Sequence, residues 1–397
     1  MLQITDNHTE QQLLPLFRLA FRPFFLVGTL FAIFSAITWG LLLFATITLP
    51  SQLPPTLWHA HEMLFGFAGA IILGFLLTAV QNWTGHPGLK GYKLGALVTL
   101  WLLGRIAIFT FPPNLYWLTM ILELSWMPLA AIVLARSVLY AKQWRNLFFV
   151  PLLFAMTLLN GISLYAFQKY DYLLAQDAIW SMLFLVLFII AVMGGRVIPF
   201  FTSKGTDSEK VQPIKVLEYC ALLPLLLLAF TVFFTPLNIF SGYLALLAGI
   251  SNSIRLIRWR PQITLPVPLL WSLHLSYLLL AIGLILYSMA LFIPAINAIT
   301  MIHLSAIGGI GGVILAMISR VSLGHTGRPL ISEKWMNIAF ASTAISGLIR
   351  LIYPYIQPNS PIMGYWLSII FWCTAFVLFV ICYAKMLLSA RIDQRPG

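Results

Sequence analysis

Uncharged stretches of about 20 residues recur along the whole sequence, and they restrict the chain to very few folds. Each stretch is long enough to cross about 30 Å of hydrocarbon as an α-helix. A backbone in lipid must satisfy its hydrogen bonds within its own helix or in a closed barrel, and barrel strands would alternate apolar and polar residues. The continuous apolar runs therefore predict an all-α, polytopic integral membrane protein.

The composition supports a membrane protein and excludes an ordinary soluble domain. The 397 residues are 60% hydrophobic and only 9% charged, whereas soluble domains carry about 25% charged residues. The three cysteines lie inside apolar runs without a Cys-x-x-Cys pair, so no disulfide framework is expected. The first residues include Asp6 and Glu10 and lack the pattern of a cleavable signal peptide.

About twelve transmembrane helices are predicted, in a single transmembrane domain that covers residues 1–397. Three four-helix repeats are one arrangement that agrees with this number. No composition break or long linker divides the chain. Three of the predicted spans end in similar polar segments at Thr84, Thr202 and Thr326, at nearly equal spacing. The alternative to a repeat is that membrane helices commonly end in small and polar residues. The predicted spans are 24–48, 58–83, 92–111, 114–138, 147–167, 174–200, 214–235, 236–256, 268–291, 294–319, 335–355 and 361–387.

The positive charge predicts the orientation. The formal net charge is +12, and it is spread over short loops that are too small for a nucleic-acid-binding domain. If the N-terminus is cytoplasmic, all 23 Lys and Arg residues except Lys169, Arg105 and Arg350 lie at cytoplasmic ends of spans. Cytoplasmic loops of membrane proteins are enriched in Lys and Arg. We therefore expect a multi-pass membrane protein, surrounded by the lipid bilayer, with both termini in the cytoplasm.

The densest group of metal-ligand side chains lies at the outer end of the second span, in Trp58-His59-Ala60-His61-Glu62-Met63. Imidazole and thioether groups suit haem iron and copper, and a carboxylate ligates metals or orients other ligands. In a regular helix His59, Glu62 and Met63 share a face, whereas His61 points elsewhere. The two histidines then cannot ligate one metal together. The alternative is an interfacial cluster that is hydrogen-bonded to water and lipid headgroups.

His303 lies in the tenth span at a similar predicted depth. A haem between the second and tenth spans would take His61 (or His59) and His303 as its axial ligands. The glycines within 308–312 follow directly. They either leave room for a flat macrocycle or let neighbouring helices pack closely.

Other ionisable residues within predicted spans are candidates for function, because charge in a membrane is costly. Arg105 and Glu123 lie at similar depth on adjacent spans. Either the two residues form a neutralising ion pair, or Arg105 binds a haem propionate and Glu123 belongs to a proton path. Arg350 is a second propionate candidate, and the alternative there is a side chain that reaches the interface.

Two further histidines are candidates for a site nearer the cytoplasm. His274 lies in the ninth span, where it is either a ligand together with His86 or His325, or hydrogen-bonded to a neighbouring helix. His325 lies in a turn-rich segment, Leu323-Gly324-His325-Thr326-Gly327-Arg328-Pro329.

The sequence resembles the NnrS family of bacterial membrane proteins, and the matching segments follow one another over nearly the whole chain. The family usually has proline where this chain has Gln81. The resemblance implies a polytopic protein that contains haem, of the b type, and copper, and that is linked to nitric oxide metabolism and protection from nitrosative stress. It does not assign individual metals to individual residues. The matching segments are Leu16–Arg18, Phe21–Phe25, Trp58–Met63, Phe65–Gly66, Gly74–Val80, Asn82–Gly85, Gly195–Phe201 and Arg320–Arg328.

A weaker likeness connects the chain with the catalytic subunit of haem–copper oxidases, which also has twelve helices in three arcs. In that subunit a haem-ligating histidine precedes an Asn-Trp pair on the second helix, as His61 precedes Asn82-Trp83 here. The sixth span of this chain contains no histidine. The three-imidazole copper centre of those enzymes is therefore not evident.

The leading hypothesis is a haem- and copper-binding membrane protein that acts on nitric oxide or its damage. The alternatives are a quinol-linked nitric oxide reductase and a twelve-helix transporter, and the sequence assigns no catalytic residue. The cofactor-binding candidates are His59, His61, His303, His274, Arg105 and Arg350. The metal-ligand candidates are His59, His61, Glu62, Met63, His303, His274 and His325.

Overall fold

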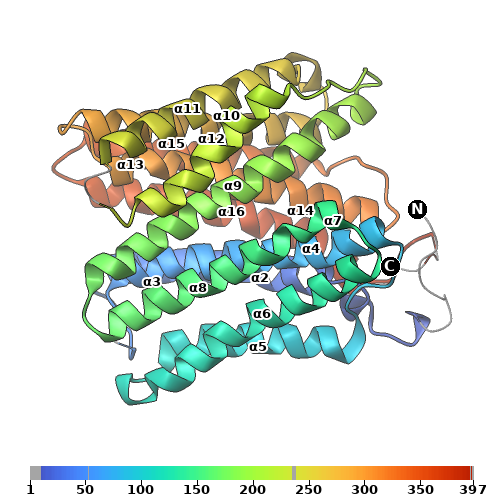
Figure 1. Ribbon diagram of the computed structural model, residues 1–397, viewed down its shortest axis with the longest axis horizontal. Helices are drawn as coiled ribbons and strands as arrows, with labels where there is room; N and C mark the ends of the chain where they lie inside the picture. Colours follow the sequence, from blue (N-terminus) through green and yellow to red (C-terminus); the bar gives the residue numbers. More distant parts are fainter. Residues whose placement is uncertain (1–9, 52, 235–237, 394, 396–397) are drawn as a thin grey trace. The chain divides into compact units, whose positions relative to one another are not determined.

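The computed structural model describes residues 10–51, 53–234, 238–393 and 395, and the regular structure within these residues is helical (Figure 1). The described helices divide into two compact units, 1–179 with 321–330 and 380–397, and 180–320 with 331–379. We call them unit 1 and unit 2. The chain passes from one unit to the other inside the helices α9, α14 and α16, and also at 330–331, in the segment between α14 and α15.

Unit 1 is built from the N-terminal helices. In it α5 packs against α6, α6 packs against α4 and α8, and α2 packs against α4. The buried Trp58 lies in an apolar cluster with Ile108, Tyr116 and Leu164. The elements of this unit are η1 (Pro15–Phe17), α2 (Phe21–Leu43), α3 (Pro55–His61), η2 (Glu62–Ala68), α4 (Gly69–Thr84), α5 (Gly91–Thr110), η3 (Pro113–Leu115), α6 (Tyr116–Tyr140), α7 (Trp144–Leu147), α8 (Phe149–Gln168) and the start of α9 (Tyr172–Gly205).

Unit 2 contains the C-terminal half of the helices. In it α11 packs between α10 and α12, while η6 packs against both α12 and α15. Leu279, Leu304 and Ala344 form an apolar cluster where these last helices meet. The elements are the rest of α9, α10 (Lys215–Thr231), α11 (Asn238–Arg258), η5 (Pro261–Thr264), α12 (Pro268–Phe292), α13 (Ala298–His303), η6 (Leu304–Gly311), α14 (Gly312–His325), α15 (Lys334–Ile356) and α16 (Pro361–Leu388). The C-terminal ends of α14 and α16 belong to unit 1.

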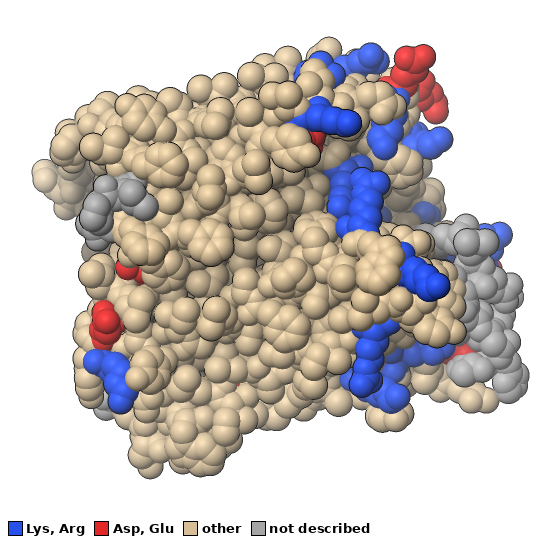
Figure 2. Space-filling view, viewed as in Figure 1, with Lys and Arg blue, Asp and Glu red and all other residues tan. Residues whose placement is uncertain are grey.

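The all-α membrane fold predicted from the sequence is confirmed. Eleven described helical segments are long and apolar enough to cross a membrane. The remaining predicted span, 214–235, corresponds to α10, which ends at Thr231 and has 17 residues. The face of the molecule in Figure 2 is uncharged over most of its area, as contact with lipid requires. The orientation of the termini stays a prediction.

The first predicted span, 24–48, is displaced toward the C-terminus relative to α2. The predicted span left Arg22 outside, at the cytoplasmic end, yet this residue lies inside the helix and is fully buried. Its charge is tolerated because its guanidinium donates to backbone carbonyls of another helix end. The helix ends at Leu43, and Ala45 follows with a positive φ of 52°, which α-helical geometry does not allow.

Two of the long spans are interrupted by π-helical segments, η2 and η6. Each begins directly after a candidate histidine, since η2 follows His61 and η6 follows His303. A π-helical turn changes the direction of the side chains that follow it and occurs frequently at functional sites. The assumption of a regular helix through Glu62 and Met63 is therefore wrong.

Candidate functional site

A buried ion pair joins α5 to its two neighbours in unit 1. One terminal nitrogen of Arg105, Nη1, donates to Glu62 Oε1 at 2.7 Å, and Nη2 donates to Glu123 Oε2. All three side chains are at most 3% exposed. A charge at this depth is stable only if it is paired and hydrogen-bonded. The ion-pair alternative for Arg105 and Glu123 is therefore what the structure contains, and we do not assign Arg105 to a haem propionate.

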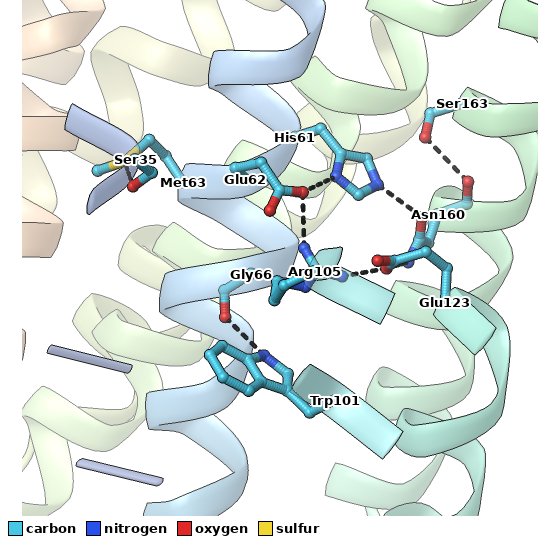
Figure 3. A network of polar contacts seen from close by, with 10 residues as sticks. All are labelled: Ser35, His61, Glu62, Met63, Gly66, Trp101, Arg105, Glu123, Asn160 and Ser163. Carbon is cyan, nitrogen blue, oxygen red and sulfur yellow. Dashed lines mark hydrogen bonds and ion pairs between the residues drawn. The ribbon is translucent and has the colours of Figure 1, made fainter. Parts of the chain in front are cut away.

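His61 extends this ion pair into a closed ring of hydrogen bonds. Its Nδ1 lies 2.8 Å from Glu62 Oε1, and its Nε2 lies 2.8 Å from Asn160 Oδ1. The Asn160 amide nitrogen donates to Glu123 Oε2 at 3.4 Å. We call the five residues His61, Glu62, Arg105, Glu123 and Asn160 the polar ring (Figure 3). It connects α3 and η2 with α5, α6 and α8.

Both ring nitrogens of His61 are engaged in this arrangement, one by a carboxylate oxygen of Glu62 and the other by the amide oxygen of Asn160. The orientation of the Asn160 amide agrees with the hydrogen bond that its nitrogen donates to Glu123. His61 is therefore committed to side chains of the polar ring and is not positioned to ligate a metal in this arrangement.

The other two ligand candidates of the second span point toward α2. The ring of His59 stacks on Trp39, with centroids 4.5 Å apart and planes 14° from parallel. Met63 Sδ accepts a hydrogen bond from Ser35 Oγ at 3.3 Å (Figure 3). The predicted common face of His59, Glu62 and Met63 is thus wrong, because Glu62 turns to Arg105 at the start of η2.

In unit 2, His303 has the hydrogen bonding that is typical of a ligating histidine. Its Nδ1 donates to the carbonyl of Ile299 at 2.6 Å. This bond selects the tautomer in which Nε2 carries the lone pair, and metal-ligating histidines commonly donate their other nitrogen to a carbonyl. His303 is half-buried and is the last residue of α13, which packs against α15.

Arg350 is on α15, in the same unit as His303. Its guanidinium lies over the ring of Tyr365, 4.3 Å from the centroid. Its Nη1 is buried and has no hydrogen-bond partner among the described residues. An orphaned donor of this kind is costly, and a carboxylate such as a haem propionate would satisfy it. His303 and Arg350 therefore fit a haem better than Arg105 does.

The glycines that follow His303 pack against other helices of unit 2. A Cβ atom at Gly308 would lie 2.7 Å from a methyl of Leu279, one at Gly309 would lie 2.8 Å from Leu280 Cβ, and one at Gly312 would lie 2.9 Å from Ser276 Cβ. The close-packing alternative is correct, and the expectation of room for a macrocycle along this strip is wrong.

The histidines predicted nearer the cytoplasm have different surroundings. His274 is buried, donates from Nδ1 to the Leu270 carbonyl and lies 3.4 Å from Thr202 Oγ1 on α9. It is thus bonded to a neighbouring helix. His325 is the last residue of α14, not part of a loop, because α14 continues past the predicted end at 319. Its ring contacts Phe21 of the same unit.

A second buried polar network, in unit 2, was missed at the sequence level. Arg255 is 1% exposed, and its guanidinium binds both carboxylate oxygens of Glu218, at 3.1 and 2.9 Å. Its Nη1 also donates to Asn252 Oδ1 and to the Tyr277 hydroxyl. The sequence places Arg255 only among the basic residues at cytoplasmic ends of spans. The spacing of Asn252 and Arg255, three residues apart on one helix face, was the available signal.

Within the described ranges, no three or more His, Cys, Asp or Glu side chains gather in a way that could hold a metal ion. A preformed copper centre of three such ligands therefore does not fit these residues. Haem needs only one imidazole on each face of its iron, and the hydrogen bonding of His303 suits it to supply one of them.

The fold and the buried polar residues define a polytopic α-helical membrane protein with ionisable groups at membrane depth. The chain belongs to the NnrS family, since the family model described as "NnrS protein" matches residues 15–391. A search of curated proteins finds no match.

Proposed function

We propose that this protein binds haem and copper in the bacterial inner membrane and acts in nitric oxide metabolism and resistance to nitrosative stress. Membership of the NnrS family supports the link to nitric oxide. The structural observation that carries the haem proposal is the state of His303. Its Nδ1–H is held by the Ile299 carbonyl, and a π-helical segment starts at the next residue.

His303 is the proposed axial ligand, and Arg350 is the proposed propionate contact, with its buried Nη1 as the donor. The sequence predicts a second axial imidazole from His59 or His61. The polar ring favours His59, because both ring nitrogens of His61 are hydrogen-bonded to other side chains. Bound haem would supply an iron that can coordinate nitric oxide. For copper, the soft donor Met63 and His59 are the candidates.

Metal analysis and a reduced-minus-oxidised absorption spectrum of the purified protein test this proposal. We expect one b-type haem signature and measurable copper. His303→Ala should lose the haem, while His274→Ala is the matched control. Both histidines donate from Nδ1 to a carbonyl four residues earlier in unit 2. Protein without haem absorbance, or full haem in the folded His303→Ala variant, contradicts the proposal.

A second pair of variants distinguishes the two histidines of the second span. His59→Gln should reduce haem occupancy, whereas His61→Gln should retain haem in the fraction that folds. The opposite result would transfer the axial role to His61. Occupancy is measured per folded protein after size-exclusion chromatography, so that loss of stability and loss of the ligand are separated.

The polar ring also favours a candidate function as a quinol-linked nitric oxide reductase. Carboxylates and histidine buried in a membrane mark proton pathways in many proteins. Reduction of two nitric oxide molecules by one quinol gives nitrous oxide, water and quinone, and consumes the two protons that the quinol releases. Quinol-dependent nitric oxide consumption by proteoliposomes supports this function. Its absence in protein that contains haem excludes it.

A further inference from the structure

Four arginines converge at one end of unit 1, and neither the haem nor the nitric oxide proposal involves them. Arg18 follows η1, Arg22 is in the first turn of α2, Arg328 follows α14 and Arg391 follows α16. The charges of Arg18, Arg328 and Arg391 all act on the guanidinium of Arg22. We call these four residues the arginine cluster. They come from segments that are far apart in the sequence, so the fold and not a basic run gathers them.

Two members of the cluster are fixed by protein carbonyls. Arg22 Nη1 donates to the carbonyls of Met386, Leu387 and Ser389 at the end of α16, at 3.2, 2.9 and 2.6 Å. Arg391 Nη1 donates to the carbonyl of His325 at the end of α14, at 2.8 Å. Arginines commonly satisfy the last carbonyls of a helix in this way. Arg22 and Arg391 are therefore held in place.

Among the described residues, the acidic groups near the cluster do not balance the four positive charges. Glu10 acts on Arg22, and Asp393 accepts two hydrogen bonds from Arg391. For this part of the chain, two acidic groups against four arginines leave a net charge of two. The ends of α14 and α16 contribute roughly −0.5 charge each, and the start of α2 contributes about +0.5. The cluster therefore retains a positive charge of about +1 to +2 on this estimate.

Arg328 carries the unused hydrogen-bonding capacity. Its Nη1 is buried without a hydrogen-bond partner among the described residues, while the residue as a whole is half-buried. The preceding Gly327 has a φ of +75°, and a Cβ there would lie 2.8 Å from Asp393 Cγ. The turn that carries Arg328 is thus held against the segment of Arg391 and Asp393. A buried donor in a positive field is a binding position for an anion.

We propose that the arginine cluster binds a phosphate-bearing anion, with Arg328 as the residue that contacts the phosphate. Guanidinium groups match phosphate oxygens in paired hydrogen bonds. The cluster lies where α2 begins and where α14 and α16 end, which is the boundary between apolar helix and polar loop in unit 1. Phospholipid headgroups occupy this level of a membrane, and basic pockets there bind anionic lipids. A phospholipid phosphate and free phosphate share the required chemistry.

The test compares the full-length protein in detergent with added phosphatidylglycerol, phosphatidylcholine or inorganic phosphate. Retained lipid is counted by native mass spectrometry, and the thermal unfolding midpoint is measured in parallel. We expect wild type to retain phosphatidylglycerol over phosphatidylcholine, and Arg328→Gln to retain about tenfold less, because a charge-assisted hydrogen bond is lost. Arg136→Gln removes an exposed arginine from α6 of the same unit and is the matched control.

The result for each anion has a defined meaning. Stabilisation by inorganic phosphate that Arg328→Gln abolishes supports the site with a free anion as its source. Equal retention of the two lipids together with no effect of phosphate overturns the proposal. Anion binding that Arg328→Gln leaves unchanged also overturns it. Arg328→Lys keeps the charge without the paired donors, and it should give an intermediate loss. These readouts do not depend on haem or copper.

Discussion

Arg105 on α5 and Glu123 on α6 form a buried ion pair between adjacent helices, and Glu62 on η2 holds the other side of the same guanidinium. The arrangement makes the pair part of the polar ring and not an isolated contact. Each member of the ring depends on its neighbours for partners, because no member is more than 4% exposed. Removal of one side chain leaves a buried charged or hydrogen-bonding group of its neighbour without its partner in the ring.

Glu123→Gln should destabilise unit 1 strongly. The variant keeps the side-chain volume but leaves the buried Arg105 guanidinium with the single carboxylate of Glu62. Breaking a buried ion pair on one side costs roughly 3–5 kcal/mol, so the midpoint of thermal unfolding in detergent should fall by several degrees. Glu209→Gln removes an exposed carboxylate and is the control. A midpoint equal to that of the control would show that the ring contributes little to stability.

Gly104→Ala should disturb the same ion pair without a change of charge. A Cβ at Gly104 would lie 2.8 Å from Glu123 Oε1 and 3.2 Å from its Cδ, so the carboxylate must move. The matched variant is Gly161→Ala on α8, whose Cβ would meet Leu124 at an ordinary 3.5 Å. Gly161→Ala should stabilise by up to about 1 kcal/mol through helix propensity. Thermal unfolding of the two variants should therefore shift in opposite directions, and shifts of the same sign would contradict the packing at Gly104.

Arg255→Lys should be poorly tolerated although the charge is retained. A lysine cannot reproduce the paired bonds to Glu218 together with those to Asn252 and Tyr277. Unsatisfied buried groups cost about 1–3 kcal/mol each. Arg258→Lys is the control three residues further along α11, where the side chain is exposed. Equal unfolding midpoints for the two variants would argue against the network in unit 2.

The stability of the folded segment after α16 should not depend on pH except under strong acid. Hydrogen bonds from Arg391 lower the pKa of Asp393 to about 2, from 3.8. A lowered pKa stabilises the folded segment above the unfolded pKa of about 3.9, and this contribution is lost as the pH falls toward the folded value. The protection of the amides of 389–393 against hydrogen exchange, measured relative to their intrinsic exchange rate at each pH, should therefore fall between about pH 4 and pH 2. Asp393→Asn should lack this pH dependence, and a transition near neutral pH in wild type would contradict the assignment.

The position of Arg22 illustrates the limit of boundary prediction. A hydropathy-based prediction places a charged residue outside a span, because it counts the free-energy cost of an isolated charge in lipid and not the partners that the residue finds in the fold. The carbonyls that satisfy Arg22 belong to 386–389, at the other end of the chain. No local pattern encodes that contact. The same limit applies to Arg255, whose partner Glu218 lies on a different helix.

The second span shows a similar limit within a single helix. The group His59, His61, Glu62 and Met63 was identified as chemically unusual from its residue types alone. The pairing of His61 with Asn160 and of Glu62 with Arg105 required the π-helical segment and the neighbouring helices. The ion pair between Arg105 and Glu123 was one of two alternatives that the sequence left open, and the structure contains it.

The sequence by itself determined that this chain is an all-α membrane protein and where nearly all of its helices lie. The reason is that the length and continuity of an apolar run, which are local properties, decide whether a segment can cross lipid. Tertiary structure alone decided which buried charges meet, which glycines serve packing, and that four distant arginines share one place. Those outcomes depend on which helices become neighbours, and each buried polar group must find its partner among them.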